Sequence, residues 1–301
     1  MNLDLLVLAL ADGLSYAGLL FLVALGLTLI FGVMGILNVA HGSLYAFGGY
    51  TAASLSGIAI QWDPSTVLLL ACLPAAAIVV GVILGAALEI GLLRRVQRGD
   101  AVVPLLITFA AFMIFEDLQK LLWGTSPYSA PEVVTRLGTI DVAGGTFNCY
   151  QLLLIPGVAL AAYVLLEFFL KRTNLGKQVT AVTHNREVAT ALGINAKRIG
   201  LVTFVLGAVL GALGGALAAP TTSLLPGVGT DTIVLSFAVV ATAGLGQITG
   251  ALIAALLIGL ARSVAVYMAP ELEVVVPYLI MVIVLLVRPN GLFAIAQARK
   301  I

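Results

Sequence analysis

Long stretches of this chain contain no charged side chain. No Asp, Glu, Lys or Arg occurs between Asp12 and Asp63, between Arg198 and Asp231, or between Asp231 and Arg262. A membrane-spanning helix needs roughly 20 consecutive, predominantly apolar residues, so the first of these gaps is long enough for two passes. The pattern therefore predicts an all-α fold, a polytopic bundle of transmembrane helices.

Polar and glycine-rich interruptions divide the apolar sequence into about nine membrane segments. The number ranges from eight to ten, because the run from Ala243 to Gln247 either separates two helices or kinks a single helix over 232–266. We expect a separation, and therefore broken helices and nine segments. The predicted segments are 13–36, 42–60, 66–93, 101–122, 150–170, 199–219, 232–243, 249–266 and 274–288.

The basic residues indicate the orientation of these segments, because cytoplasmic loops carry an excess of Lys and Arg. In the nine-segment arrangement all basic residues lie on one side of the membrane except Lys120, Arg136 and Arg262. An uninterrupted helix over 232–266 would put Glu271 inside or the basic C-terminus outside. We therefore expect the N-terminus outside and the C-terminus inside. The basic residues of the inner side are Arg94, Arg95, Arg98, Lys171, Arg172, Lys177, Arg186, Lys197, Arg198, Arg288, Arg299 and Lys300.

Composition supports this interpretation and narrows the chemistry. Of the 301 residues, 61% are apolar and 10% are charged, against about 25% charged residues in soluble domains. A net charge of +1 gives no reason to expect a nucleic-acid partner. The N-terminus lacks the basic cluster of a cleavable signal peptide, so the first membrane helix is expected to act as the insertion signal. Cys72 and Cys149 both fall near the outer face, where two unpaired thiols are favoured over a disulfide.

Two loops are long enough to fold. The outer loop, 123–150, contains several Pro and Gly residues and is expected to form an irregular external cap. The inner loop, 171–198, contains a helix-prone run at 177–182 and a second helical stretch at 186–192, which Gly193 closes as a helix stop. Two short helices exceed what a simple connection requires, so the inner loop is a candidate docking surface.

Two polar interruptions are candidates for a transport path. The first, over 35–42, contains Asn38 and His41 and is followed by Ser43, and the second follows Thr242. Transporter sites are commonly built where helices are discontinuous, because freed backbone groups and helix ends can meet polar ligand atoms. We predict that these four residues line the path, with Thr242 facing the other three. The alternative is a tight turn in which Asn38 and His41 only satisfy local backbone groups.

Charged and small residues within the segments are interpreted as structural. Glu116 and Lys120, like Glu167 and Lys171, are spaced i,i+4 near segment ends and are expected to pair on one helix face. No acid stands at the centre of a predicted segment, which disfavours a proton- or sodium-coupled carrier. Glycines at spacings of three and four predict closely packed helices. They are Gly207, Gly211, Gly214 and Gly215, together with Gly81 and Gly85.

The sequence gives no indication of an enzyme. It contains no GxxxxGK[ST] phosphate-binding loop, so it is not expected to hydrolyse ATP alone. The two histidines, His41 and His184, lie far apart in the predicted topology, so neither a metal cluster nor a His-based triad can be assembled. We expect no catalytic site, no metal and no cofactor.

Three motifs resemble those of one transporter family. The stretch 26–42, GLTLIFGVMGILNVAHG, resembles the N-terminal signature of branched-chain amino-acid ABC transporter permeases, H-type subunit. The stretch 189–195, ATALGIN, resembles the ATPase-coupling loop of that family, and 286–293, LVRPNGLF, resembles its C-terminal signature. The motifs occur in the family's order and span nearly the whole chain.

The resemblance implies an importer permease in a bacterial inner membrane, with residues 1–301 forming one transmembrane domain. It implies four partner subunits: a second permease subunit, two cytoplasmic ATPase subunits and a periplasmic substrate-binding protein. Within the coupling loop, 172–198, the residues expected to contact the ATPase are Lys177, Arg186, Glu187, Ala189, Gly193 and Asn195. Alternative solutes are urea, short amides and aromatic acids, and an alternative mechanism is an ATP-independent channel.

Overall fold

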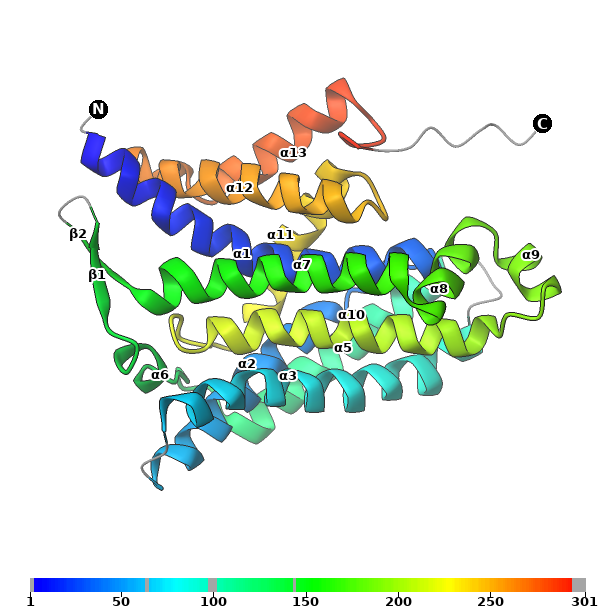
Figure 1. Cartoon of the computed structure of the whole chain (residues 1–301), viewed down its shortest axis with the longest axis horizontal. Helices are drawn as coiled ribbons and strands as arrows, with labels where there is room; N and C mark the ends of the chain where they lie inside the picture. The colour runs from blue at the N-terminus through cyan, green and yellow to red at the C-terminus, as the bar shows by residue number, and fades with distance from the viewer. Residues whose placement is uncertain (1–2, 63–64, 97–101, 143–144, 294–301) are drawn as a thin grey trace.

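Most of the chain folds into long helices that run along the longest axis of the molecule (Figure 1). The structure is a computed structural model that describes residues 3–62, 65–96, 102–142 and 145–293. A two-stranded hairpin lies at one end of the helices, and the short helices α8 and α9 lie at the other (Figure 1). We call these the hairpin end and the α8–α9 end.

A helix lies on each of the predicted membrane segments. In the part of the chain that is described, six helices are long and apolar enough to cross a membrane. The helix α2 is not among the six, and α11 and α13 are shorter, with 16 and 13 residues. Nine crossings therefore remain a prediction. The helices on these segments are α1 (Leu3–Met34), α2 (His41–Ile60), α3 (Thr66–Leu88), α5 (Val102–Trp123), α7 (Ile155–Arg172), α10 (Ala196–Ala218), α11 (Val228–Ala243), α12 (Ile248–Met268) and α13 (Val275–Val287).

Some of these helices have extensions of different geometry. The helix α3 continues through a π-helical turn, η1 (Glu89–Leu93), into α4 (Arg94–Val96). A second π-helical turn, η2 (Tyr150–Leu154), leads into α7, and a 3₁₀ turn, η3 (Pro270–Leu272), precedes α13. Such insertions shift the side chains that follow to another helix face.

The first helix begins earlier than predicted, at Leu3 rather than at residue 13. The predicted boundary follows the last charged residue, Asp12. In the structure Asp12 lies within the helix, and its carboxylate accepts a hydrogen bond from the hydroxyl of Ser263 on α12, with an Oγ–Oδ2 distance of 3.4 Å. The single charged residue Asp12 therefore does not mark the start of α1.

Both predicted helix breaks are confirmed. The helix α1 ends at Met34, and Gly35 follows with a φ of +66°, in the left-handed region that favours glycine. The helices α11 and α12 are separate, as predicted, and Gly244 between them has a φ of +100°. The C-terminal motif closes this second break, because the amide of Leu292 donates to the carbonyl of Thr242 at 2.9 Å.

The loop at the hairpin end is more regular than expected. It contains α6 (Glu132–Thr135) and two antiparallel strands, β1 (Thr139–Val142) and β2 (Gly145–Asn148), with Thr139 opposite Asn148. The expectation of an irregular cap, and of a purely helical fold, was wrong here. Residues Thr139–Val142 do alternate polar and apolar side chains, a strand signal that the Pro and Gly residues of the loop outweighed in the sequence analysis.

At the opposite end, the expected pair of short helices is present as α8 (Asn174–His184) and α9 (Arg186–Ala191). Side-chain caps fix their starts. The Thr173 hydroxyl accepts from the amide of Gly176, and the Asn185 side chain accepts from the amides of the second and third residues of α9. Nine of the twelve Lys and Arg residues of the described chain lie at this end: Arg94, Arg95, Lys171, Arg172, Lys177, Arg186, Lys197, Arg198 and Arg288.

The helix α10 packs against both α1 and α2 through its glycines. A Cβ added at Gly215 would overlap the carbonyl oxygen of Tyr45 on α2, and one added at Gly207 would lie 2.7 Å from the carbonyl oxygen of Gly26 on α1. Gly211 leaves room for the His41 ring, whose Nε2 would lie 2.6 Å from an added Cβ. The predicted glycine-mediated packing is confirmed, because only hydrogen side chains permit these approaches.

Adding a methyl group at Gly215 is therefore expected to destabilise the bundle. Overpacking typically costs about 1–3 kcal/mol, which outweighs the roughly 1 kcal/mol that alanine gains in helix propensity. We expect Gly215→Ala to lower the thermal unfolding temperature of the purified protein by several degrees. The control is Gly200→Ala on the same helix, where an added Cβ meets nothing within 4 Å. Equal unfolding temperatures for the two variants would contradict this packing.

Candidate functional site

After the end of α1 the chain turns back into the bundle. The Nε2–H of His41, the first residue of α2, donates to the carbonyl oxygen of Val23 at 3.1 Å. Val23 precedes the end of α1, Met34, by eleven residues, which is about 16 Å along a helix. The segment 35–40 therefore runs back beside α1, and α2 begins inside the bundle.

The polar groups at this break are buried. Asn38, His41 and Ser43 have essentially no exposed surface. In the described chain neither amide atom of Asn38 has a hydrogen-bond partner, and neither has Nδ1 of His41. A buried unsatisfied polar atom costs about 1–3 kcal/mol, so it calls for an explanation. They are unpaired polar atoms within an otherwise apolar part of the bundle.

Ser43 joins the break to α5. Its hydroxyl lies 3.5 Å from the carbonyl oxygen of Phe112, and its own carbonyl oxygen accepts from Nε2 of Gln119 at 3.4 Å. One helical turn before Phe112 on α5, the hydroxyl of Thr108 accepts a hydrogen bond from the amide of Val39 at 3.3 Å. These three contacts connect the start of α2 to one face of α5. Hydrogen bonds of this length are individually weak.

Thr242 does not face this cluster, contrary to the expectation. The start of α11 meets the start of α2, since a Cβ at Gly42 would overlap the carbonyl oxygen of Gly229. Thr242 lies thirteen residues after Gly229, about 20 Å along the helix. Its side chain is buried at the α8–α9 end of the bundle, beside the C-terminal motif. The structure thus places Thr242 about 20 Å along α11 from the contact at Gly42, away from His41 and Ser43 at the start of α2.

The predicted coupling residues lie on and around α9. Lys177, Arg186, Glu187 and Asn195 are exposed, and Gly193 ends the helix with a φ of +85°. The side chain of Asn195 accepts from the amide of Arg198 at 3.1 Å and so caps α10. Ala189 differs from the expectation, because it is only 2% exposed and packs with Val179, Val182 and Ile199. It packs α9 against α8 and the start of α10.

Two apolar residues on the outer face of α9 were missed. Val188 is 54% exposed and Leu192 is 77% exposed. Their i,i+4 spacing places them on one side of the helix, about 60–100° around the axis from the buried Ala189. This spacing was visible in the sequence, but apolar residues in a membrane protein are first interpreted as packing. An exposed apolar pair on a polar loop indicates a contact surface.

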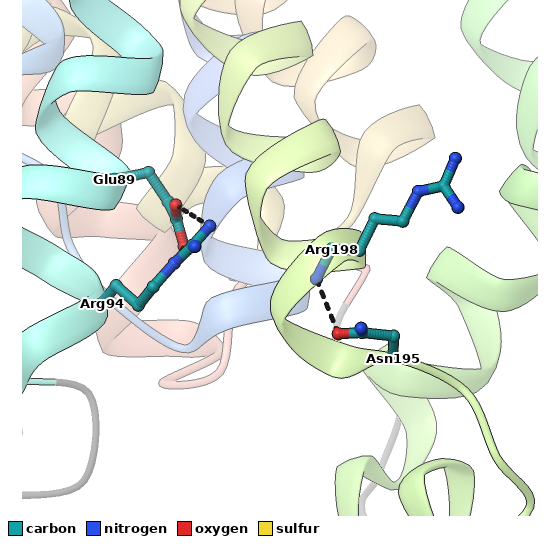
Figure 2. Close-up of polar contacts among 4 residues, drawn as sticks. All are labelled: Glu89, Arg94, Asn195 and Arg198. Carbon is teal, nitrogen blue, oxygen red and sulfur yellow. Dashed lines mark hydrogen bonds and ion pairs between the residues drawn. The ribbon is translucent and has the colours of Figure 1, made fainter.

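A basic cleft lies beside α9. Its volume is about 610 Å³, and its walls come from α4, α9 and the start of α10: Arg94, Arg186, Thr190, Gly193, Ile194, Asn195, Ala196 and Lys197. Figure 2 shows Arg94 on one wall and Asn195 on the other, with Arg198 directed away from Arg94. The cleft suits an acidic group by its charge.

Arg94 is held in this cleft by an acid that the sequence analysis did not single out. Glu89, in the π-helical turn η1, is 1% exposed, and its Oε2 and Oε1 accept from Nη2 of Arg94 at 2.6 Å and from Nε at 3.2 Å (Figure 2). This is the bidentate arrangement in which carboxylate–guanidinium pairs are strongest. The π-helical insertion, which no local sequence signal announces, turns Glu89 inward.

The two predicted i,i+4 charge pairs are confirmed. Lys120 pairs with Glu116 at 3.4 Å, and Lys171 pairs with Glu167. Cys72 and Cys149 are free. Among the described residues there is no group of three or more His, Cys, Asp or Glu side chains that could hold a metal ion.

These features define a class: a helical membrane permease with interrupted helices and a folded loop at its basic end. The chain belongs to the family of branched-chain amino acid transport system permease components, whose sequence pattern matches residues 9–285.

Two relatives cover nearly the whole chain. The high-affinity branched-chain amino acid transport system permease protein BraD of Pseudomonas aeruginosa is 26% identical over 298 residues, with 97% of each chain covered. The corresponding protein LivH of Escherichia coli K12 is 26% identical over 301 residues, with 96% of each chain covered. Among solved structures, PsaBC from Streptococcus pneumoniae in complex with Fab has a TM-score of 0.51 at 14% identity, covering 93% of this chain and 91% of that chain. That likeness concerns the fold alone.

The Glu89–Arg94 pair leads to an asymmetric prediction. Without Arg94 the buried carboxylate loses its partner and cannot reach water, whereas without the Glu89 charge the partly exposed Arg94 can turn to solvent. We expect Arg94→Gln to lower the thermal unfolding temperature by several degrees more than Glu89→Gln. Lys171→Gln, at an exposed pair, is the control with almost no effect. A larger loss for Glu89→Gln than for Arg94→Gln would refute the proposed burial of the acid.

Proposed function

We propose that this chain is the permease subunit of an ATP-binding-cassette importer that moves branched-chain or related amino acids across the bacterial inner membrane. A second permease subunit, two cytoplasmic ATPase subunits and a periplasmic substrate-binding protein complete the transporter. The α8–α9 end faces the cytoplasm and the hairpin end faces the periplasm. The observation that carries this proposal is the folded, apolar-tipped helix α9 at the basic end of a chain that belongs to this permease family.

The α1–α2 break supplies the transport path in this proposal. An amino acid is zwitterionic, and removing water from its charges costs several kcal/mol unless polar groups replace the hydration. Asn38 and Nδ1 of His41 are unsatisfied polar groups within an apolar bundle, and Ser43 adds a hydroxyl beside them. They are buried here, so the structure corresponds to a closed path. Thr242 would act only at the cytoplasmic exit.

The helix α9 supplies the contact with the ATPase. Val188 and Leu192 insert into an apolar groove of that partner, while Arg186, Glu187 and Lys177 surround the contact with charge. Ala189 and Gly193 act indirectly, because the first packs α9 on α8 and the second sets the turn toward α10. The basic cleft beside α9 accepts acidic side chains of the same partner.

Leucine uptake by the reconstituted transporter tests this function. We expect proteoliposomes that contain the complete complex to accumulate leucine only with ATP and the binding protein. Val188→Asp and Leu192→Asp place a charge in an apolar contact, so each should reduce uptake at least tenfold and reduce copurification of the ATPase subunits.

The matched control is Asn174→Asp, an exposed change at the start of α8 that should leave uptake unchanged. Uptake that proceeds normally with both α9 variants would remove α9 from the coupling contact. Leucine accumulation without ATP would instead favour an ATP-independent channel.

A further inference from the structure

A small cavity lies at the α8–α9 end of the bundle, between α1, α8 and the α11–α12 break. Its volume is about 150 Å³, and its walls include Thr28 and Gly32 of α1, Thr180 of α8 and Gly246 of the break. The end of α7 contributes Leu170. None of these residues belongs to the α1–α2 break or to the contact surface of α9, so the cavity is a feature that neither region explains.

The cavity is separate from the α1–α2 break. A Cβ added at Gly26 of α1 would lie 3.0 Å from the ring of His41. At about 100° per residue, Thr28 and Gly32 lie roughly 200° and 240° around the α1 axis from Gly26. The cavity therefore adjoins the opposite face of α1, and the transport path assigned to the α1–α2 break does not include it.

The end of α1 meets the α11–α12 break beside this cavity. Gly246, whose φ is +81°, lies so close to Gly32 that a Cβ on it would be 3.3 Å from the Gly32 Cα. The helix α8 also packs against α1. The cavity therefore exists only while α1, α8 and the α11–α12 break keep the arrangement seen here.

The cavity has an apolar interior and a mouth that faces solvent. Leu29 and Val179, which line it, are buried, and so is Thr28. Within the described chain the Thr28 hydroxyl has no hydrogen-bond partner. Thr180 and Thr183 of α8 also line the cavity and are exposed. They mark the side on which the cavity opens, at the α8–α9 end.

These properties suit a short branched aliphatic group that is joined to a charged one. A dry apolar cavity of about 150 Å³ can hold benzene, and the isobutyl side chain of leucine is smaller than benzene. The ammonium and carboxylate groups of leucine would stay in water at the mouth, so they need no charged partner in the protein. An amide of the same shape, as in asparagine, would lose its hydrogen bonds to water on entering the cavity.

We propose that this cavity is a cytoplasmic regulatory site, which binds the aliphatic side chain of a branched-chain amino acid and so inhibits further import. This inference rests on the proposed function, because that function makes the α8–α9 end cytoplasmic and the structure a closed state of the path. A ligand favours the conformation in which its site exists. A bound amino acid therefore holds α1, α8 and the α11–α12 break in the closed arrangement and slows the transport cycle.

Ligand binding to the assembled complex, without the binding protein, tests the site. Saturation-transfer NMR can compare leucine with asparagine, and we expect leucine to bind about tenfold more tightly or better. Thr183→Trp adds a bulky ring at the mouth of the cavity and should weaken leucine binding by about tenfold or more. The matched control is His184→Trp, at the next exposed position of α8 but outside the cavity lining, which should leave leucine binding unchanged.

Thr28→Val tests the interior of the cavity without changing its shape. It replaces an unpaired buried hydroxyl with a methyl group, so leucine binding should stay equal or become tighter and the unfolding temperature should not fall. Weaker leucine binding by this variant would contradict an aliphatic occupant.

Transport measurements test the regulatory role. In proteoliposomes that contain the complete transporter, unlabelled leucine on the α9 side should lower the initial import rate of labelled leucine by about threefold or more. Asparagine at the same concentration should have no effect. Thr183→Trp should import at the wild-type rate in the absence of this leucine and should resist the inhibition.

Equal binding of leucine and asparagine, or inhibition that persists in Thr183→Trp, would overturn the proposal. Leucine binding that Thr183→Trp abolishes, without any effect of leucine on import, would overturn the regulatory role. Import by the wild-type transporter separates this failure from a failure of the proposed function. If labelled leucine is imported and leucine on the α9 side has no effect, only the regulatory site is refuted. If no leucine is imported, the proposed function itself fails.

Discussion

The fold depends on direct backbone contact between α10 and the two helices α1 and α2. In lipid no hydrophobic effect drives one apolar helix onto another, so association relies on close packing and small residues. The glycines of α10 meet a carbonyl oxygen of α1 at Gly26 and a carbonyl oxygen of α2 at Tyr45. Side chains at these positions would separate the three helices, and the bundle would lose the centre around which α3, α5 and α11 pack.

This packing explains why a helix can begin inside the bundle. The ring of His41 occupies the space beside Gly211 and bonds to the carbonyl oxygen of Val23. The same contact orients the first turn of α2 and holds Asn38 in an apolar environment. A polar interruption at this depth is tolerated only where protein or a water-filled cavity surrounds it. By surrounding this segment with protein, the central helices allow a polar site to exist within the membrane.

The helix α10 also connects the two regions assigned to transport and to coupling. It begins at Ala196, three residues after Gly193 ends the α9 turn, and it continues without interruption past Gly211 to Ala218. A displacement of α9 by a partner would therefore act on the helix that confines His41. We expect ATPase movements to reach the α1–α2 break along this route, with the Glu89–Arg94 pair fixing the neighbouring end of α3.

Local sequence signals predicted the parts of the structure that local physics determines. Charge-free runs located the helices, glycines located both breaks, and Gly193 located the stop after α9. Relations between distant segments were not predictable in this way. The separation of Thr242 from Ser43, the inward orientation of Ala189 and the burial of Glu89 all depend on how helices are placed in space. The hairpin was missed because only β1 alternates polar and apolar residues, and the loop around it contains several Pro and Gly residues.

The most direct test of the account is the accessibility of Asn38 during transport. In a background carrying Cys72→Ser and Cys149→Ser, the reaction of Asn38→Cys with a small methanethiosulfonate reagent can be followed in the reconstituted complex. Ser56→Cys, at a position on α2 that is equally buried and away from the break, is the control. The account predicts slow labelling of Asn38→Cys at rest, at least tenfold faster labelling while ATP and leucine are turned over, and no change for Ser56→Cys. Labelling of Asn38→Cys at the same rate with and without turnover would contradict a transport path through the α1–α2 break.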